Sequence, residues 1–227
     1  CALPDVHESP FRRRELIYGR GDRSLQRLLA VEKPGGLNVV GLNIVGEHAI
    51  DEPKHDGKVK IIRLSTKPEA HVYKPVADAI AAADIIILGP GGLFTTLLAN
   101  LVVSGVPESL RKSHAKVVYI MNLMTEYGQT YGFTARNHVE TIESYVGRGI
   151  IDYILINNGT IPDTVLKKYK KAHAQRVLDD LDSKDYTVIR TDLVHPKRVA
   201  KVKGDQLKRS LVRHDPIKIA QHIQKLV

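Results

Sequence analysis

The chain has 227 residues, of which 43% are hydrophobic and 26% are charged, a composition that excludes a disordered or fibrous protein. Its single cysteine excludes an intramolecular disulfide framework and fits a reducing compartment, so we expect a cytoplasmic protein. No apolar run reaches membrane-spanning length, and we expect no membrane partner.

The formal net charge of +9 points to acidic ligands. Much of the excess lies in the last third of the chain, as in the run Lys167-Lys168-Tyr169-Lys170-Lys171. However, the chain has 9 Tyr, 3 Phe and no Trp, which is a poor supply of stacking side chains for single strands. We therefore expect no specific nucleic acid, and favour a solvated face or a pocket for an acidic small molecule.

Residues 1–69 predict a small appendage. Residues 1–36 are polar and irregular, and strand-like runs follow at 37–45 and 58–64. The Asp56-Gly57 pair between these two runs predicts a β-hairpin.

Residues 70–227 predict a core in which strands alternate with helices. Strands are expected at 85–88, 115–120, 151–156, 187–191 and 198–203. Helices are expected at 76–83, 93–101, 134–146, 162–181 and 217–226. This alternation indicates an α/β fold, a Rossmann-like three-layer α/β/α arrangement with a largely parallel sheet.

The clearest functional signal lies where the strand at 85–88 runs into Gly89-Pro90-Gly91-Gly92 and then into a helix. Such a turn places backbone N–H groups and a helix N-terminus against an anion, usually a phosphate. Thr95 lies in the first helical turn, where its hydroxyl could reach phosphate oxygens. The alternative is that the glycines serve only close packing.

Two further polar turns, Asn122–Thr125 and Asn157–Gly159, also follow strands. Because ligands of open α/β sheets bind beyond the carboxyl ends of the strands, we expect the three turns to meet there. Asn122 and Thr125 are candidates to hydrogen-bond a ribose, a base or a phosphate. Their alternative role is to cap the turn in which they lie.

These blocks, taken in order, resemble one family. Residues 88–96 are similar to the segment leucine-glycine-proline-glycine-serine-leucine-tyrosine-threonine-serine of the gluconeogenesis factors (YvcK), which belong with the 2-phospho-L-lactate transferases (CofD). The turn 122–125, the strand 151–157 and the end Arg213-His214-Asp215-Pro216 resemble later parts of the family. The resemblance covers about residues 70–227 and implies a core that holds a nucleotide-linked ligand by its diphosphate.

The resemblance implies a UDP-sugar-binding regulator, linked to central carbon metabolism, the cell wall and cell shape. The diphosphate would rest on Gly89, Gly91, Gly92 and Thr95.

Two later residues complete the implied site. Tyr169 stands near a tyrosine of the gluconeogenesis factors and could stack on a base, or else cover lysine stems at the surface. Arg213 would clamp the diphosphate, because a guanidinium fork suits phosphate oxygens. Its alternative is an ion pair with Asp215.

The alternative function is a magnesium-dependent transferase that moves phospholactate or a similar group from a guanosine diphosphate adduct to a deazaflavin. Gln129 and Tyr131 stand where the family usually has glutamate and aspartate, which removes candidate metal ligands or bases. We assign no catalytic residue and no metal ligand, and we expect magnesium only for a transferase. His138 is interpreted as a structural, hydrogen-bonded histidine.

Family members open with a glycine-glycine-glycine-threonine-glycine loop, which the sequence from Cys1 onward does not contain. We therefore expect the chain to be the C-terminal part of a longer product that holds this loop. Alternatively, a partner subunit, such as a second copy in a homo-oligomer, covers the sheet edge that would otherwise be open.

Overall fold

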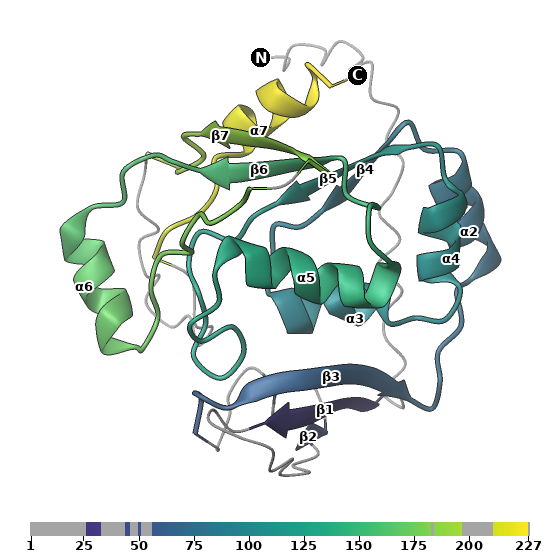
Figure 1. Cartoon of the computed structure of the whole chain (residues 1–227), viewed down its shortest axis with the longest axis horizontal. Helices are drawn as coiled ribbons and strands as arrows, with labels where there is room; N and C mark the ends of the chain where they lie inside the picture. The colour runs from purple at the N-terminus through teal and green to yellow at the C-terminus, as the bar shows by residue number, and fades with distance from the viewer. Residues whose placement is uncertain are drawn as a thin grey trace, which may run out of the picture.

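Four parallel strands form the central sheet of the computed structural model, which describes residues 26–32, 44–45, 50, 56–182, 184–196 and 211–226 (Figure 1). The strands are β4 (Ile85–Leu88), β5 (Lys116–Ile120), β6 (Tyr153–Asn157) and β7 (Thr187–Thr191), and they lie in the order β4-β5-β6-β7. Every neighbouring pair is parallel. The predicted α/β fold and its four main strands are confirmed.

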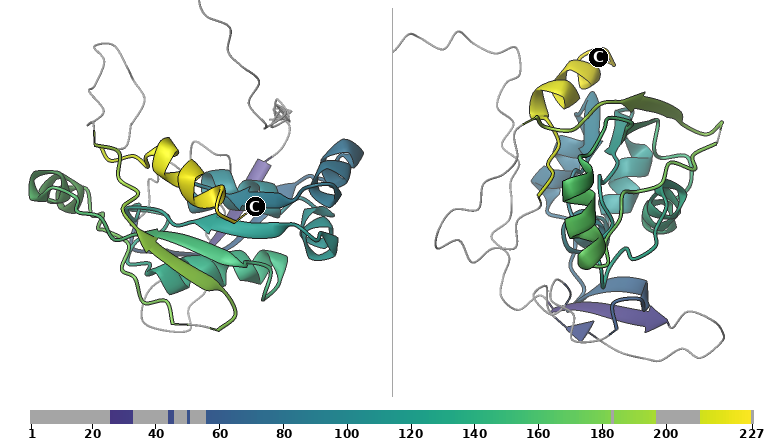
Figure 2. Two further views of the ribbon diagram at one scale, coloured as in Figure 1. Left: turned by 90° about the horizontal axis from the view of Figure 1, so that it is seen from above. Right: turned by 90° about the vertical axis from the view of Figure 1, so that its left-hand side faces the viewer.

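Helices cover both faces of this sheet, because β5 and β6 are apolar on both sides. One face packs on α3 (Leu98–Leu101) and α5 (Ala135–Val146) through Val117, Tyr119, Ile154 and Ile156. The other face packs on α7 (Pro216–Ile223) through Val118, Ile120 and Leu155. The strand order follows the chain order, and α7 lies on the face of the sheet opposite to α3 and α5 (Figure 2).

A second, antiparallel sheet lies beyond the α3–α5 layer (Figure 1). It contains β1 (Gln26–Glu32), β2 (Ile44–Val45) and β3 (Lys60–Lys67) in the order β2-β1-β3. Ile61 and Leu64 of β3 belong to the same buried cluster as α3 and α5, and the Leu64 amide donates to the Tyr145 hydroxyl at 2.7 Å. The two sheets thus share one core, while the boundary between 1–69 and 70–227 stays a prediction.

The predicted hairpin around Asp56-Gly57 is wrong. β3 pairs with β1, which lies within the stretch predicted to be irregular, and β2 pairs with the other edge of β1. Gly57 instead packs closely on the Tyr127 ring, and its carbonyl accepts from the Gly128 amide at 2.9 Å. The turn at Asp56-Gly57 therefore makes a long-range contact with residues 127–128, where the sequence had predicted a hairpin. Residues 37–43 of the predicted strand lie outside the described residues.

The helix predicted at 162–181 is too long, because α6 spans only Asp163–Lys171. His173 adopts a positive φ of 55° with its ring 4.9 Å from that of Tyr127, and the chain beyond it forms bridges from Arg176 to Met124 and from Leu178 to Thr134.

The other helices need smaller corrections. Residues 93–101 begin as a π-helical turn (Leu93–Leu97) before α3, and α2 spans Lys74–Ala81. The helix α4 (Val106–Lys112) was not predicted, and the predicted strand at 198–203 lies outside the described residues. Within the described ranges, no helix has both the length and the apolar composition needed to cross a membrane.

His138 of α5 is fully buried, and its ring is nearly perpendicular to that of Phe133 at a centroid distance of 5.5 Å. Its Nδ1 lies 2.8 Å from the Thr134 carbonyl oxygen, which only accepts, so Nδ1 carries the proton. Its Nε2 contacts no hydrogen-bond partner among the described residues. Burial lowers the pKa of His138, which therefore stays neutral in the fold.

We expect the free energy of unfolding to decrease as the pH falls from about 7.5 to about 5.5. In this range the unfolded chain takes up a proton at His138, whose pKa is then near 6.5, while the folded chain takes it up only at lower pH, so protonation stabilises the unfolded state. His138→Gln keeps a donor for Thr134 but cannot titrate, so its Tm should fall less over this range. The exposed His114→Gln is the control and should follow the wild type. Circular dichroism measures this, and equal Tm slopes for the wild type and His138→Gln would contradict it.

Candidate ligand-binding site

The glycine turn after β4 is pressed against the end of β5. Gly89 has a φ of +84°, and a Cβ on it would lie 3.2 Å from the Ile120 carbonyl oxygen. Gly92 starts the helical turn, and its carbonyl accepts from the amides of Thr96 and Leu97, both at 3.0 Å. The first-turn amides of a helix have no intrahelical acceptor, so this turn offers donors to an anion beyond the strand end.

The side chain of Asn122 holds this turn in place by a hydrogen bond. Its Nδ2 donates to the Gly91 carbonyl at 2.9 Å, and its Oδ1 lies 3.4 Å from the Tyr119 hydroxyl. Tyr119 is completely buried, which raises the pKa of its hydroxyl and keeps it a donor. The structure therefore brings Asn122 and Gly91 together as predicted, with the amide of Asn122 fixing the turn on β5.

The polar groups of Thr125 and Asn157 join neighbouring loops in the same way. Thr125 is buried, and its hydroxyl accepts from the Gln175 amide at 3.0 Å. Asn157 Oδ1 accepts from the amides of Leu193 (2.8 Å) and Gly159 (3.1 Å). The three turns thus lie at the carboxyl end of the sheet, where Figure 2 (right) shows α6 in front of the strand ends.

Arg213 lies on the segment that leads into α7, and its side chain is exposed. The alternative ion pair with Asp215 is not among the ion pairs of the described residues. Asp215 instead caps α7, since its carboxylate accepts from the amides of Ile217 and Lys218. The Arg213 side chain is therefore at the surface, without an ion pair to Asp215.

The segment carrying Arg213 reaches the glycine turn through His214. Its Nε2 lies 3.0 Å from the Met121 carbonyl oxygen, and its ring lines an apolar groove of about 340 Å³ together with Gly89 and Pro90. Burial lowers the pKa of His214, so it is neutral and donates from Nε2. Tyr169 is half-buried, and its hydroxyl faces Leu211 and Val212 on this same segment.

Glu126 is the residue that the sequence reasoning missed. A Cβ on Gly92 would lie 3.8 Å from its Oε2, 2.5 Å from Thr95 Oγ1 and 3.8 Å from Thr96 Oγ1, so three oxygens surround one point of the turn. Its backbone is fixed by Thr130, whose hydroxyl accepts from the Glu126 amide at 2.9 Å. The available signal was its position directly after Thr125, in the turn beyond β5.

These oxygens fit a hard divalent cation that also binds phosphate. In the described part of the chain, no three His, Cys, Asp or Glu side chains gather as a metal site by themselves. A cation here would therefore take further ligands from a bound diphosphate.

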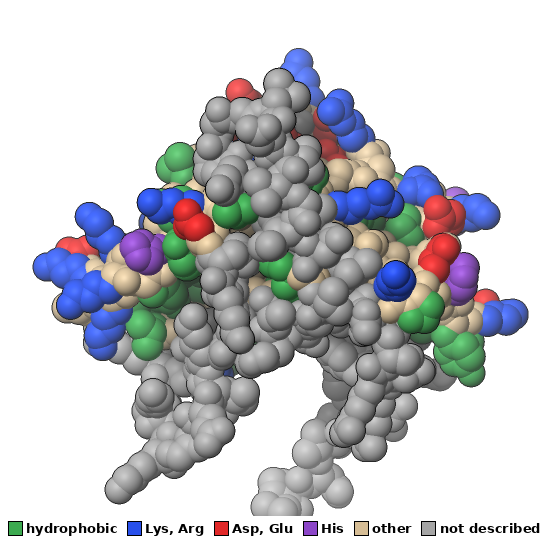
Figure 3. Space-filling view, turned by 90° about the horizontal axis from the view of Figure 1, so that it is seen from below, with side chains coloured by type: hydrophobic (Ala, Val, Ile, Leu, Met, Phe, Trp, Pro, Cys, Tyr) green, Lys and Arg blue, Asp and Glu red, His purple; other side chains and the backbone are tan. Residues whose placement is uncertain are grey.

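Positive charge surrounds this end of the sheet. Arg213 is exposed, and Arg176 donates from Nη2 to the Asn157 carbonyl at 2.7 Å. The four lysines of α6 are exposed and form the blue group at the left edge of Figure 3. This distribution favours an anionic ligand.

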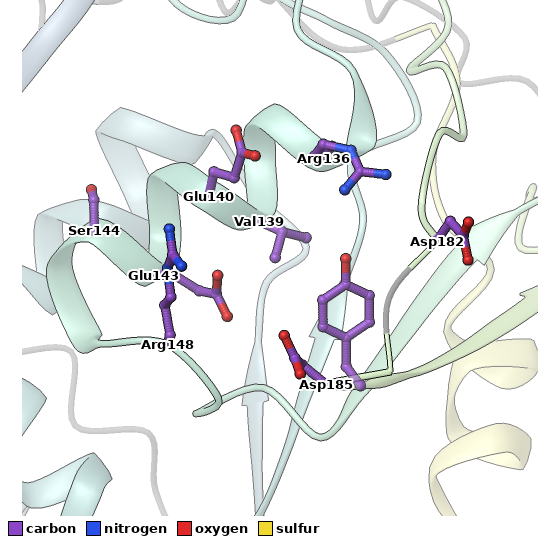
Figure 4. A pocket seen from close by; sticks show the side chains of 9 residues that line it. Arg136, Val139, Glu140, Glu143, Ser144, Arg148, Asp182 and Asp185 are labelled. Carbon is purple, nitrogen blue, oxygen red and sulfur yellow. The ribbon is translucent and has the colours of Figure 1, made fainter.

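A second cavity of about 340 Å³ lies between α5 and the segment before β7, near the amino ends of β6 and β7 (Figure 4). Its charged lining consists of Arg136, Glu140, Glu143, Arg148, Asp182 and Asp185. Four carboxylates against two guanidinium groups make this cavity unsuited to phosphate, so the glycine turn remains the better anion site.

Known proteins are similar to this chain in sequence and in fold. The family model described as 2-phospho-L-lactate transferase CofD matches residues 29–194. The gluconeogenesis factor of Halalkalibacterium halodurans is 41% identical over 140 residues, 62% of this chain and 42% of that protein. The gluconeogenesis factor of Bacillus subtilis is 34% identical over 190 residues, 82% of this chain and 56% of that protein.

A solved structure of a UPF0052 family member from Bacillus halodurans has a TM-score of 0.72 and 31% identity to this chain. The match covers 89% of this chain and 59% of that one. The chain spans about half the length of the curated relatives it matches.

Gly92→Ala should destabilise the fold by about 1–3 kcal/mol, because the new Cβ would lie only 2.5 Å from Thr95 Oγ1. Thr95 causes the collision alone, since Glu126 Oε2 and Thr96 Oγ1 are at an ordinary contact distance of 3.8 Å. Adding Thr95→Ala removes the colliding oxygen, so the double variant should be more stable than Gly92→Ala alone. Urea titrations measure both. A double variant that loses the sum of the two single effects would show that the collision is not the cause.

Proposed function

Since the chain belongs to the 2-phospho-L-lactate transferase CofD family and is related to the gluconeogenesis factors, we propose that it binds a nucleoside-diphosphate-linked ligand of the UDP-sugar class. The observation that carries this proposal is the glycine turn after β4. Asn122 holds this turn at the carboxyl end of β5, and the helical turn Leu93–Leu97 begins directly after it. The diphosphate would accept from backbone N–H groups of residues 89–95 other than Pro90, with the Thr95 hydroxyl beside it.

Arg213 supplies the matching charge in this proposal. A guanidinium donates to two phosphate oxygens at once, and the exposed side chain of Arg213 lies one residue from His214, which borders Gly89 in the groove. The names of the relatives support a role in gluconeogenesis. We extend the proposal to a regulator without chemistry of its own, acting in central carbon metabolism and on the cell wall and cell shape.

Arg213→Ala should weaken binding of UDP-N-acetylglucosamine by about tenfold or more, because a charge-assisted hydrogen bond contributes about 1.5–3 kcal/mol. Isothermal titration calorimetry of the whole chain measures the affinity. Arg148→Ala, an exposed arginine beside the second cavity, is the control and should bind as the wild type. A wild type that gives no heat with the UDP-sugar or with UDP would refute the proposed function.

Glu126 favours the second candidate, a magnesium-dependent transferase. A carboxylate beside a diphosphate is repulsive unless a cation lies between them, and Glu126, Thr95 and Thr96 offer the oxygens that such a cation prefers. Bound magnesium would neutralise charge on the transferred group. The chain's own contribution would be to hold the cation and the diphosphate at the turn.

If magnesium takes part, saturating Mg²⁺ should tighten binding of a guanosine diphosphate adduct to the wild type and have little effect on Glu126→Gln. Without the cation, Glu126→Gln should bind as tightly as the wild type or tighter, since a repulsive charge is removed. Glu140→Gln, on the exposed face of α5, is the control. Calorimetry with and without Mg²⁺ decides this, and an affinity that ignores the cation in every variant would exclude the magnesium role.

A further inference from the structure

The backbone around Arg213 is tied to two different loops. On its N-terminal side, the amides of Leu211 and Val212 donate to the Tyr169 hydroxyl at 3.0 and 3.4 Å. On its C-terminal side, His214 Nε2 donates to the Met121 carbonyl at 3.0 Å. Arg213 thus lies between hydrogen bonds to α6 on one side and a hydrogen bond to the loop after β5 on the other.

The surroundings of Tyr169 favour a side chain that is held in place by packing and by its hydroxyl over one whose ring is free at the surface. Tyr169 packs with Leu166, Val194 and Val212 on the small buried cluster that joins α6 to the body of the protein. Its hydroxyl oxygen is the only part of a tyrosine that a phenylalanine lacks, and that oxygen is the acceptor of both amides.

We propose that Tyr169 is a positioning residue, whose hydroxyl fixes the backbone that carries Arg213 and so supports ligand binding through Arg213. This proposal rests on the proposed function, because that function assigns the diphosphate to Arg213. A preformed backbone lowers the entropy that an arginine loses when it closes on a phosphate. Stacking of the Tyr169 ring on a base is a different role, since it needs the ring and not the oxygen.

Tyr169→Phe separates these roles, because it keeps the ring and removes the acceptor. If Tyr169 acts through Arg213, Tyr169→Phe should weaken binding of UDP-N-acetylglucosamine by about five- to tenfold, the loss expected for one or two hydrogen bonds. The same substitution should then have little further effect in an Arg213→Ala background. Residues that act through one another give such non-additive effects in a double-mutant cycle.

Tyr145→Phe is the matched control. The Tyr145 hydroxyl accepts from the Leu64 amide at 2.7 Å, which is the same kind of bond in the contact between α5 and β3. Tyr145→Phe should lower the Tm and leave the affinity unchanged. This control separates a general loss of stability from a loss of positioning.

The experiment is calorimetry on the whole chain as wild type, Tyr169→Phe, Arg213→Ala, the double variant and Tyr145→Phe. A weakened Tyr169→Phe with no further loss in the double variant supports the proposal. Additive losses, or a Tyr169→Phe that binds as the wild type while Arg213→Ala is weakened, would overturn it. Absence of binding by the wild type is a separate result, which would refute the proposed function and this assignment with it.

Discussion

The hydrogen bond from Asn122 to the Gly91 carbonyl holds the glycine turn after β4 against the end of β5. Glycines make this turn possible, but neither they nor Pro90 have a polar side chain that could fix its position. The amide of Asn122, backed by the buried Tyr119, supplies that fixed point from the neighbouring strand. This contact holds the turn from which the helix starts at Gly92, and the proposed anion would bind there.

The other loops at the carboxyl end follow the same principle. Thr125 joins the loop after β5 to the segment after α6, and Asn157 joins the ends of β6 and β7. The polar side chains of Asn122, Thr125 and Asn157 follow strands in the sequence, where ligand contacts are expected. In the structure they hydrogen-bond neighbouring loops to one another instead. The groups that the proposed diphosphate would meet are the backbone N–H groups of the glycine turn and the exposed side chain of Arg213.

The sequence predicted the parallel sheet because the run Ile85–Leu88 and its successors are apolar on both faces, and it placed the glycine turn because glycine chemistry is local. The sequence-based predictions were wrong where a contact between residues far apart in the chain determines the local structure. α6 ends at Lys171, and the chain turns where the ring of His173 lies beside that of Tyr127. β3 pairs with β1 instead of forming a hairpin across Asp56-Gly57. The partner of Asn122 lies 31 residues away, so its role as a brace was not distinguishable from a ligand contact.

The most direct test is a crystal structure of the protein with UDP-N-acetylglucosamine bound. The diphosphate is predicted to accept from backbone N–H groups of the turn at 89–95 other than Pro90, with Arg213 on its other side and the Asn122–Gly91 hydrogen bond intact. A ligand found in the carboxylate-lined cavity between α5 and β7, or a turn whose amides face away from the diphosphate, would contradict this assignment.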